Sequence, residues 1–504
     1  MIKSKSKNLY VYLYFLLLSC VTLAIVSEAS YLYPVIDWVD PNCLYTMGKA
    51  MMNGKVLYKD IFDHKGPYTY FYFGFAYLLT KDSYVGLYLL QIVLAFVFAI
   101  FTKKTLELYG IKDLKKNLII CTVIHLSTYY SFAVSVGNSV EEIAMPFLAI
   151  AMYISVKRIK SEQNLKLLDY IIIGLIGGFL FWTKFTLLAF FVGWFIYFLV
   201  VYIKQKSGKD ILKMISGILL GVIIITIPCI IYFAVNNALY DLYEVYFYDN
   251  LFVYTGRDNK NFFYAIGSGL GGICLALISN FQISIPIIFG IVVFFKKKIK
   301  ERFLLLASFI SFLVLSYVFA TWYRYYAVPM SIFAVFGYIG LFQIDFKKKL
   351  KHESREKAKK ISITLASIFL CFSCIFAFFM NGNQYYFLKK KEDTAQFKFA
   401  KIINNSDIEN PKLLNYGFLD GGFYYALKQV PSFKYFCTTN CKIDEMEKEN
   451  KKYIEEKQAD FIVIKIWKKY KEELTSSDYT EVSRVKQYYR GEYVTYILYQ
   501  VVRN

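Results

Sequence analysis

Acidic side chains stand beside two long apolar runs, where a carboxylate could act as a general base. Asp37 and Asp40 follow the first apolar run, and the adjacent Glu141 and Glu142 open a later one. A carboxylate has an ordinary pKa of about 4, so each is ionised at neutral pH and could take a proton from an attacking hydroxyl group. Structural roles compete with this interpretation. Asp40 before Pro41 fits a helix N-cap, and two acidic residues in a first helical turn favour the positive end of the helix dipole.

Basic side chains that could bind an anion lie in similar places. Lys65 belongs to the polar stretch after the first apolar run, beside Asp63 and His64, which are further candidates. Lys184 follows an apolar run directly, and Arg324 lies among tyrosines. A phosphate leaving group needs cations facing it, and a planar guanidinium suits two-point phosphate contact. Lys184 could instead only extend its charged end toward a membrane interface.

The elements that carry these residues are apolar runs long enough to cross a membrane. The chain of 504 residues is 57% hydrophobic and 19% aromatic, above the roughly 45–50% apolar content of soluble domains. Runs of about 15–25 residues match a bilayer core of about 30 Å. We therefore predict an α-helical multi-pass membrane protein with eleven spans, at 10–28, 84–102, 118–136, 142–156, 168–183, 186–203, 211–235, 278–295, 303–320, 326–343 and 361–380.

Short basic loops between the runs indicate the topology. With the N-terminus in the cytoplasm, all of these loops lie inside, in agreement with the excess of Lys and Arg in cytoplasmic loops. Much of the net charge of +21 lies in them, which favours membrane topology over nucleic-acid binding. The C-terminal segment then lies outside. The basic loops are 3–7, 103–116, 157–166, 204–213, 296–302 and 347–360.

Three stretches leave alternatives open in this topology. Residues 68–79 are too short for a span. The Gly-rich residues 262–277 would put the basic loop 296–302 outside if they crossed the membrane. Both stretches are therefore interpreted as juxtamembrane or re-entrant helices. The first run could also be a signal peptide with a cleavage site at 27–29, but residues 30–66 lie outside in either case.

Polar outer segments at 30–67, 137–142 and 236–261 are long enough to form a site at the membrane surface. Ionisable groups at span ends on one membrane face favour a functional site over isolated helix caps. Two other sequence patterns do not indicate a functional site. A formal G-x-G-x-x-G match at 267–272 follows no predicted strand, so a dinucleotide site is rejected. The three His residues are scattered and show no zinc spacing. The need for a divalent cation is left open.

The C-terminal segment, 381–504, is expected to form a separate small α/β domain. Strands are predicted at 413–416, 460–465 and 493–499 from apolar runs and alternation, and a charged helix at 442–457. Cys437 and Cys441 lie in this outer segment, where a disulfide between them could form. The domain could bind an acceptor polymer or only cover the membrane module.

The segment from Asp40 to Pro67 resembles the first outer loop of bacterial GT-C glycosyltransferases, which are related to protein mannosyltransferases and to the lipid A aminoarabinose transferase. The resemblance rests on Tyr45, Gly48 and Gly54 and on the stretch YKDIFDHKGP at 58–67. The turn before Ala144-Met145-Pro146 and the stretch 413–424 also resemble this superfamily. The resemblance implies two domains. The first is a GT-C-like catalytic module at 1–380, with juxtamembrane helices in its outer loop at 30–83, and the second is an extracytoplasmic α/β domain at 381–504.

The resemblance also implies the activity. A sugar would move from a polyprenyl-phosphate donor, with inversion, to an extracytoplasmic polysaccharide, teichoic acid, glycolipid or protein acceptor at the plasma membrane. Asp40, Glu141 and Glu142 would be the catalytic residues. The donor phosphate would be bound by Lys65, Lys184 and Arg324, although relatives often carry His at the last position. A polysaccharide polymerase or a lipid-linked-sugar flippase is the alternative. A flippase needs no soluble outer domain and more often carries charges inside its spans.

Overall fold

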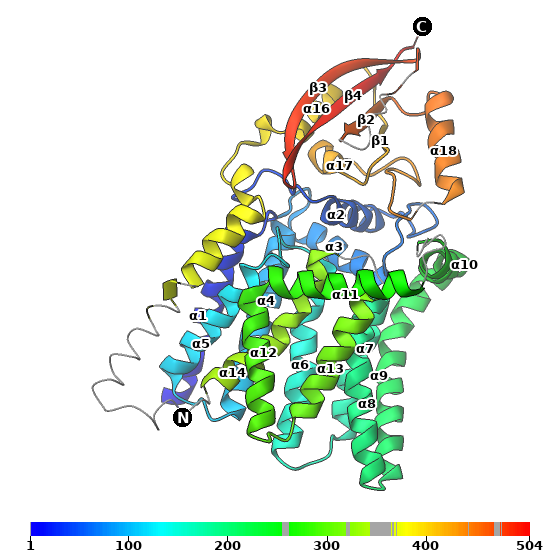
Figure 1. Cartoon of the computed structure of the whole chain (residues 1–504). Helices are drawn as coiled ribbons and strands as arrows, with labels where there is room; N and C mark the ends of the chain where they lie inside the picture. The colour runs from blue at the N-terminus through cyan, green and yellow to red at the C-terminus, as the bar shows by residue number, and fades with distance from the viewer. Residues whose placement is uncertain are drawn as a thin grey trace. The chain divides into compact units, whose positions relative to one another are not determined.

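The computed structural model describes residues 2–254, 262–318, 323–342, 364, 367–368, 370–441, 443–467, 474 and 476–503 (Figure 1). The predicted basic loop 347–360 lies outside these residues. Contacts divide the chain into two compact units. The helical unit contains residues 1–26, 91–227 and 259–380, and the mixed unit contains 27–90, 228–258 and 381–504. The first outer loop thus groups with the C-terminal segment, whereas the sequence predicts it as part of the membrane module.

The helical unit is built from apolar helices that pack through small residues. A Cβ atom at Gly290 of α12 would lie 2.4 Å from Gly337 Cα of α14, so the backbones of these two helices approach as closely as glycine allows. The first turn of α4 and the end of α9 belong to the mixed unit. The helices are α1 (Ile2–Val26), α4 (Val85–Leu108), α5 (Leu114–Tyr129), α6 (Val140–Lys160), α7 (Leu167–Thr183), η1 (Phe185–Leu188), α8 (Ala189–Lys204), α9 (Gly208–Val235), α11 (Phe262–Ser279), α12 (Phe281–Lys296), α13 (Arg302–Tyr317), η3 (Arg324–Met330) and α14 (Ser331–Phe342).

By length and composition, four helices among the described residues are long and apolar enough to cross a membrane: Leu9–Val26, Val85–Leu108, Phe185–Lys204 and Gly208–Val235. Residues Ile266–Ser279 of α11 meet α12 at 101°, and this bent pair would be a fifth span or a re-entrant loop. Figure 1 shows α11 running across the other helices of the unit. Shorter apolar helices occupy Leu167–Thr183, Arg302–Tyr317 and Leu370–Met380. A mostly helical architecture with apolar helices long enough to span a membrane is confirmed, and the count of eleven spans stays a prediction.

The mixed unit contains a four-stranded sheet in the order β1-β2-β4-β3, in which only the β1–β2 pair is parallel. Residues Phe461 to Ile464 of β2 are all buried, because this strand lies between two others and its side chains form the core. The elements are α2 (Val39–Met52), α3 (Pro67–Thr80), α10 (Leu239–Asp241), the π-helix η2 (Leu242–Val253), η5 (Asn383–Tyr385), η6 (Lys391–Asp393), α16 (Ala395–Asn404), β1 (Leu413–Tyr416), α17 (Phe423–Leu427), α18 (Asp444–Glu455), β2 (Phe461–Ile466), β3 (Tyr479–Tyr489) and β4 (Glu492–Val501).

The strands predicted at 413–416, 460–465 and 493–499 and the helix predicted at 442–457 are confirmed by β1, β2, β4 and α18. Strand β3 was not predicted. Its sequence, YTEVSRVKQYY, is largely exposed from Thr480 to Lys486 and therefore lacks the apolar alternation that marks a half-buried strand. Its pairing with β4, visible as the long hairpin in Figure 1, supplies the missing stabilisation.

Close packing and a buried hydrogen-bond network hold α2 in the mixed unit. A Cβ atom at Gly48 would lie 2.4 Å from Gly74 N of α3, so α2 and α3 touch through their backbones. The Thr46 hydroxyl donates to Asp420 Oδ2 at 2.6 Å. Asp420 Oδ1 in turn accepts from the Asn415 amide at 3.0 Å and from Gly422 N–H at 2.9 Å. Burial raises the pKa of Asp420, and these donors partly offset that effect. The middle of α2 is thereby fixed against the loop after β1.

Candidate active site

Asp40 lies in the first turn of α2, but it is not the N-cap. The helix begins at Val39, its N-cap is Trp38, and no side chain caps it. Asp40 is half-buried, and no hydrogen-bond or ion-pair partner for its carboxylate occurs among the residues that the structure describes. A carboxylate placed in this way can accept a proton without first breaking an interaction inside the protein.

Asp37 is held differently. It is buried, its Oδ2 accepts a hydrogen bond from Arg490 N–H at 3.1 Å, and its own N–H donates to Glu28 Oε2 at 2.7 Å. Its carboxylate therefore connects the segment before α2 to the turn between β3 and β4. This position favours a structural role for Asp37 and leaves Asp40 as the more accessible of the two acids.

Asp63, His64 and Lys65 form a charged group before α3. Tyr70 donates its hydroxyl to Asp63 Oδ2 at 2.8 Å, and His64 Nδ1 lies 3.2 Å from Asp63 Oδ1. Burial acts to raise the pKa of Asp63. The positive charge of Lys65 and the contacts from His64 and Tyr70 outweigh it and hold that pKa well below its usual range. Asp63 is therefore ionised at neutral pH.

Lys65 stays protonated in this group. Burial acts to lower its pKa, but the charges of Asp63 and Asp40 outweigh that effect and hold the pKa above its usual range. No direct ion pair to its ammonium occurs among the described residues. Its backbone is fixed, because Lys65 N–H donates to the Tyr70 hydroxyl at 3.0 Å and Lys65 O accepts from the Tyr58 hydroxyl at 2.5 Å. We call Asp40, Asp63, His64 and Lys65 the α2 cluster.

A second group lies in the helical unit. Glu141 Oε1 is 2.5 Å from Lys184 Nζ, and both groups are largely shielded from solvent. The ammonium also lies 4.0 Å from the ring centroid of Tyr326 and 5.4 Å from that of Tyr325. The helix α7 ends at Thr183, and the backbone of Lys184 is extended, with φ −162° and ψ 106°. The Lys184 side chain therefore leaves the helix and lies against these rings. We call Glu141, Lys184, Tyr325 and Tyr326 the α6 cluster.

Glu142 does not share the environment of Glu141. It is buried, and its Oε2 accepts from Asn138 N–H at 2.8 Å while Gln91 Nε2 donates to Oε1 at 3.0 Å. Ser139 is the N-cap of α6 and accepts from Glu142 N–H. These bonds resemble a capping box, which satisfies backbone donors at a helix start. The contacts of Glu142 therefore fit the structural role at a helix start that competes with a catalytic one.

Arg324 opens the 3₁₀-helix η3 and precedes the two tyrosines of the α6 cluster in sequence. Its guanidinium carbon lies 4.8 Å from the ring centroid of Phe132. Of the predicted site residues, Asp40, Asp63, His64 and Lys65 thus come together in the mixed unit, while Glu141, Lys184 and the Arg324 segment come together in the helical unit. Sequence reasoning missed Tyr70, Gln91 and Tyr326, because no spacing distinguishes these polar side chains from many others in a chain with 46 Tyr.

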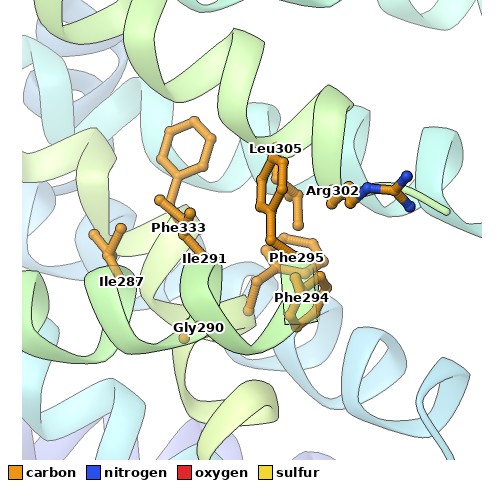
Figure 2. Close-up of a pocket in the computed structure, with 10 residues that line it drawn as sticks. Ile287, Gly290, Ile291, Phe294, Phe295, Arg302, Leu305 and Phe333 are labelled. Atoms are coloured by element: carbon orange, nitrogen blue, oxygen red, sulfur yellow. The ribbon is translucent and has the colours of Figure 1, made fainter. Parts of the chain in front are cut away.

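Two other features of the described residues are not candidate sites. The apolar cavity in Figure 2 lies among α12, α13 and α14 of the helical unit, and Arg302 is the only charged side chain in its lining, so it offers almost no polar group to a sugar. Within the described ranges, no three His, Cys, Asp or Glu side chains are grouped to hold a metal ion. The lining is Ile287, Gly290, Ile291, Phe294, Phe295, Arg302, Leu305, Phe333, Phe336 and Gly337.

The chain resembles a known protein in its fold and not in its sequence. No family model matches the chain, and no curated protein matches it in sequence. The crystal structure of ArnT from Cupriavidus metallidurans bound to undecaprenyl phosphate aligns with a TM-score of 0.60 at 9% identity, covering 98% of each chain. The chain has the fold of ArnT. The apo ArnT structure aligns with a TM-score of 0.57 at 9% identity, over 92% of this chain and 93% of ArnT.

The ArnT-like fold agrees with the fold that the resemblance of the segment from Asp40 to Pro67 implies. Together with the apolar helices, it supports a location in a membrane. Because ArnT and this chain are only 9% identical, the likeness concerns the fold.

Proposed function

We propose that the chain is an inverting glycosyltransferase that moves a sugar from a polyprenyl-phosphate donor to an acceptor on the outer side of the plasma membrane. The fold is shared over nearly the full length with ArnT, which has been crystallised with undecaprenyl phosphate. A donor whose lipid stays in the bilayer has to react at the membrane surface. Apolar helices combined with polar segments that carry carboxylates and cations suit such a reaction.

The α2 cluster would supply the base. An acceptor hydroxyl attacks the anomeric carbon, Asp40 takes its proton, and the carbon–oxygen bond to the phosphate breaks. The polyprenyl phosphate leaves with the bonding electron pair. The negative charge that develops on it would be stabilised by cations. Lys65 of the α2 cluster is proposed for this role, and Lys184 and Arg324 of the helical unit stay candidates predicted from the sequence. A single displacement of this kind inverts the anomeric centre.

The observation that carries the proposal is the state of Asp40. It is half-buried, it has no direct partner among the described residues, and its charge acts on Lys65. A carboxylate that only stabilised the fold would be expected to make contacts like those of Asp37 or Glu142. Glu141 and Glu142 remain proposed alternatives for the base, with the ion pair to Lys184 and the hydrogen bonds to the 138–139 turn counting against them.

A test measures the chemistry directly. The full-length protein, purified in detergent, is incubated with membrane extracts that contain lipid-linked sugars and with cell-envelope acceptors, and the released lipid is identified by mass spectrometry. A glycosyltransferase of the proposed kind releases polyprenyl monophosphate and extends the acceptor by one sugar. A polymerase that uses diphosphate-linked chains releases polyprenyl diphosphate, and a flippase releases neither lipid. Either of the last two results replaces the proposal with the alternative function.

A further inference from the structure

A groove in the mixed unit lies away from both clusters in sequence and has no role in the chemistry described above. Its volume is about 320 Å³, at the lower end of the roughly 300–1,000 Å³ of small-molecule sites. Two segments line it: residues 386–394, and residues 486–493 at the end of β3 and the start of β4. We call it the tyrosine groove; its lining is Tyr386, Lys389, Asp393, Thr394, Lys486, Gln487, Tyr488 and Tyr493.

The floor of the groove is held rigidly. Tyr386 and Tyr488 pack in one apolar cluster with Tyr33 and Val35, and the Tyr386 hydroxyl donates to the Tyr488 carbonyl. Gln487 Oε1 accepts from Ala395 N–H at 2.6 Å. The two segments are thus tied to each other by buried hydrogen bonds, so a ligand would meet a preformed surface and little ordering would be needed on binding.

An exposed aromatic face stands at the groove. The Tyr493 side chain is 59% exposed although it is large and apolar. It meets Tyr488 edge to face, with centroids 5.9 Å apart and planes at 82°, and Tyr488 is itself stacked on Tyr385. An exposed tyrosine ring presents a flat face with negative partial charge, which suits the C–H groups on one face of a sugar ring.

Two lysines of the lining lie beside tyrosine rings, one at Tyr493 and one at Tyr386. Lys486 Nζ lies 5.4 Å from the Tyr493 centroid, and Lys389 Nζ lies 5.6 Å from the Tyr386 centroid. Both lysines are exposed, and neither has an ion-pair partner among the described residues. Asp393 is the single carboxylate of the lining. The groove therefore combines a sugar-stacking face with a net positive charge, from two lysines against one carboxylate.

We propose that the tyrosine groove binds a negatively charged glycan, in which a sugar ring stacks on Tyr493 and a carboxylate or phosphate of the polymer contacts Lys486 and Lys389. The identification of this glycan as the acceptor of sugar transfer rests on the proposed function. The binding of the glycan to the groove does not depend on that function. Asp393 can accept a hydrogen bond from a sugar hydroxyl. The groove would keep an acceptor polymer bound to the enzyme between successive reactions.

Binding is measured by isothermal titration calorimetry on the full-length protein in detergent, with three probes: oligogalacturonate, poly(glycerol phosphate) and a neutral malto-oligosaccharide. We expect at least one anionic probe to bind more tightly than the neutral one, and added salt to weaken that binding. Tyr493→Ala and Lys486→Ala should each lower the affinity about tenfold, equivalent to about 1.4 kcal/mol. The two anionic probes separate a carboxylate-bearing from a phosphate-bearing polymer.

Matched controls keep the result specific. Tyr240→Ala removes a tyrosine of the same unit that is 70% exposed, and Lys451→Ala removes an exposed lysine of α18; neither should change the affinity. Preference for the neutral probe, no binding of either anionic probe, or equal loss in the controls overturns the proposal. The Asp40→Asn variant should still bind the anionic probe. If it binds but the wild type shows no transfer, the proposed function fails alone; if transfer occurs without binding, the groove proposal fails alone.

Discussion

At the scale of single residues, contacts separate acids that look alike in the sequence. Asp37 and Asp40 stand three positions apart, yet Asp37 accepts a hydrogen bond from the backbone of Arg490 while Asp40 has no such partner among the described residues. Glu141 and Glu142 are adjacent, yet one pairs with Lys184 and the other holds the turn at Asn138. Because their contacts differ, mutations of these four acids are expected to have different effects on activity and stability.

The first prediction concerns Asp40. Asp40→Asn keeps the shape of the side chain and removes the base, so transfer should fall by about 10²- to 10⁴-fold, the usual contribution of a general base. Its thermal unfolding should stay close to that of the wild type, because no hydrogen bond is lost and Asp63 still offsets the charge of Lys65. Asp37→Asn should retain most of the transfer, since the amide oxygen can still accept from Arg490 N–H. Release of polyprenyl phosphate at a near-normal rate by a stable Asp40→Asn protein would move the base to another acid.

The second prediction concerns Lys184. Lys184→Ala leaves the buried carboxylate of Glu141 without its cation, which should destabilise the protein by about 3–5 kcal/mol. Lys184→Ala combined with Glu141→Gln should recover much of this loss, because the uncompensated charge is gone. If Lys184 also binds the donor phosphate, the double variant should be stable and still bind the lipid donor poorly.

Thermal unfolding and lipid-donor affinity of the purified variants check this prediction. Lys213→Ala is the control, since Lys213 pairs with Asp210 within one helix at a more exposed site, where a pair contributes about 0–1 kcal/mol. Wild-type donor affinity in the double variant would limit Lys184 to a structural role.

At the scale of elements, α2 is placed by partners from distant parts of the sequence. It packs on α3 through Gly48 and Gly74, and Thr46 donates to Asp420 from the C-terminal segment. Cys43 on the same helix has its sulfur 4.0 Å from that of Cys437. The disulfide considered from sequence spacing, between Cys437 and Cys441, is not formed, and all three thiols are free.

The third prediction is that oxidation joins Cys43 to Cys437. Both thiols are buried and adjacent, and small side-chain rotations would bring the sulfurs to the roughly 2.05 Å of a disulfide. The interaction with Cys437 and burial raise the pKa of Cys43 well above its usual value, so the reaction should be slow at neutral pH. After treatment with oxidised glutathione, non-reducing peptide mass spectrometry should find Cys43 linked to Cys437. Cys441→Ser should leave this link intact, and a Cys437–Cys441 peptide would contradict the prediction.

At the scale of the whole molecule, the fold aligns with ArnT over 98% of both chains although 91% of aligned residues differ. Apolar helices can be built from many sequences as long as length and hydropathy are kept. The distribution of basic loops is a separate constraint, since it decides which side of the membrane each polar segment faces.

The fourth prediction follows from those loops. Alkaline phosphatase fused after Asn504 should be active, because the enzyme folds only outside the cytoplasm, while fusions within 347–360 should be inactive. A fusion after residue 116 should also be inactive, because it lies at the end of the basic loop 103–116. The reverse pattern would put every proposed site residue on the cytoplasmic side.

The amino-acid sequence by itself determined the membrane class, the apolar helices, three of the four strands and the acidic and basic candidates. Hydropathy, charge and short-range periodicity are local properties, and they survive without knowledge of the partners of each residue. It also carried the GT-C resemblance, in a segment whose glycine at position 48 is required by the close approach of α2 to α3.

Only the tertiary structure decided which candidates are engaged. The pairing of Glu141 with Lys184, the hydrogen bond from Arg490 to Asp37 and the approach of Cys43 to Cys437 each join residues 43 to 453 positions apart. Strand β3 and the tyrosine groove likewise exist only when distant segments pair and pack. Such contacts depend on how the whole chain packs, and that information is spread over the sequence rather than written at any one motif.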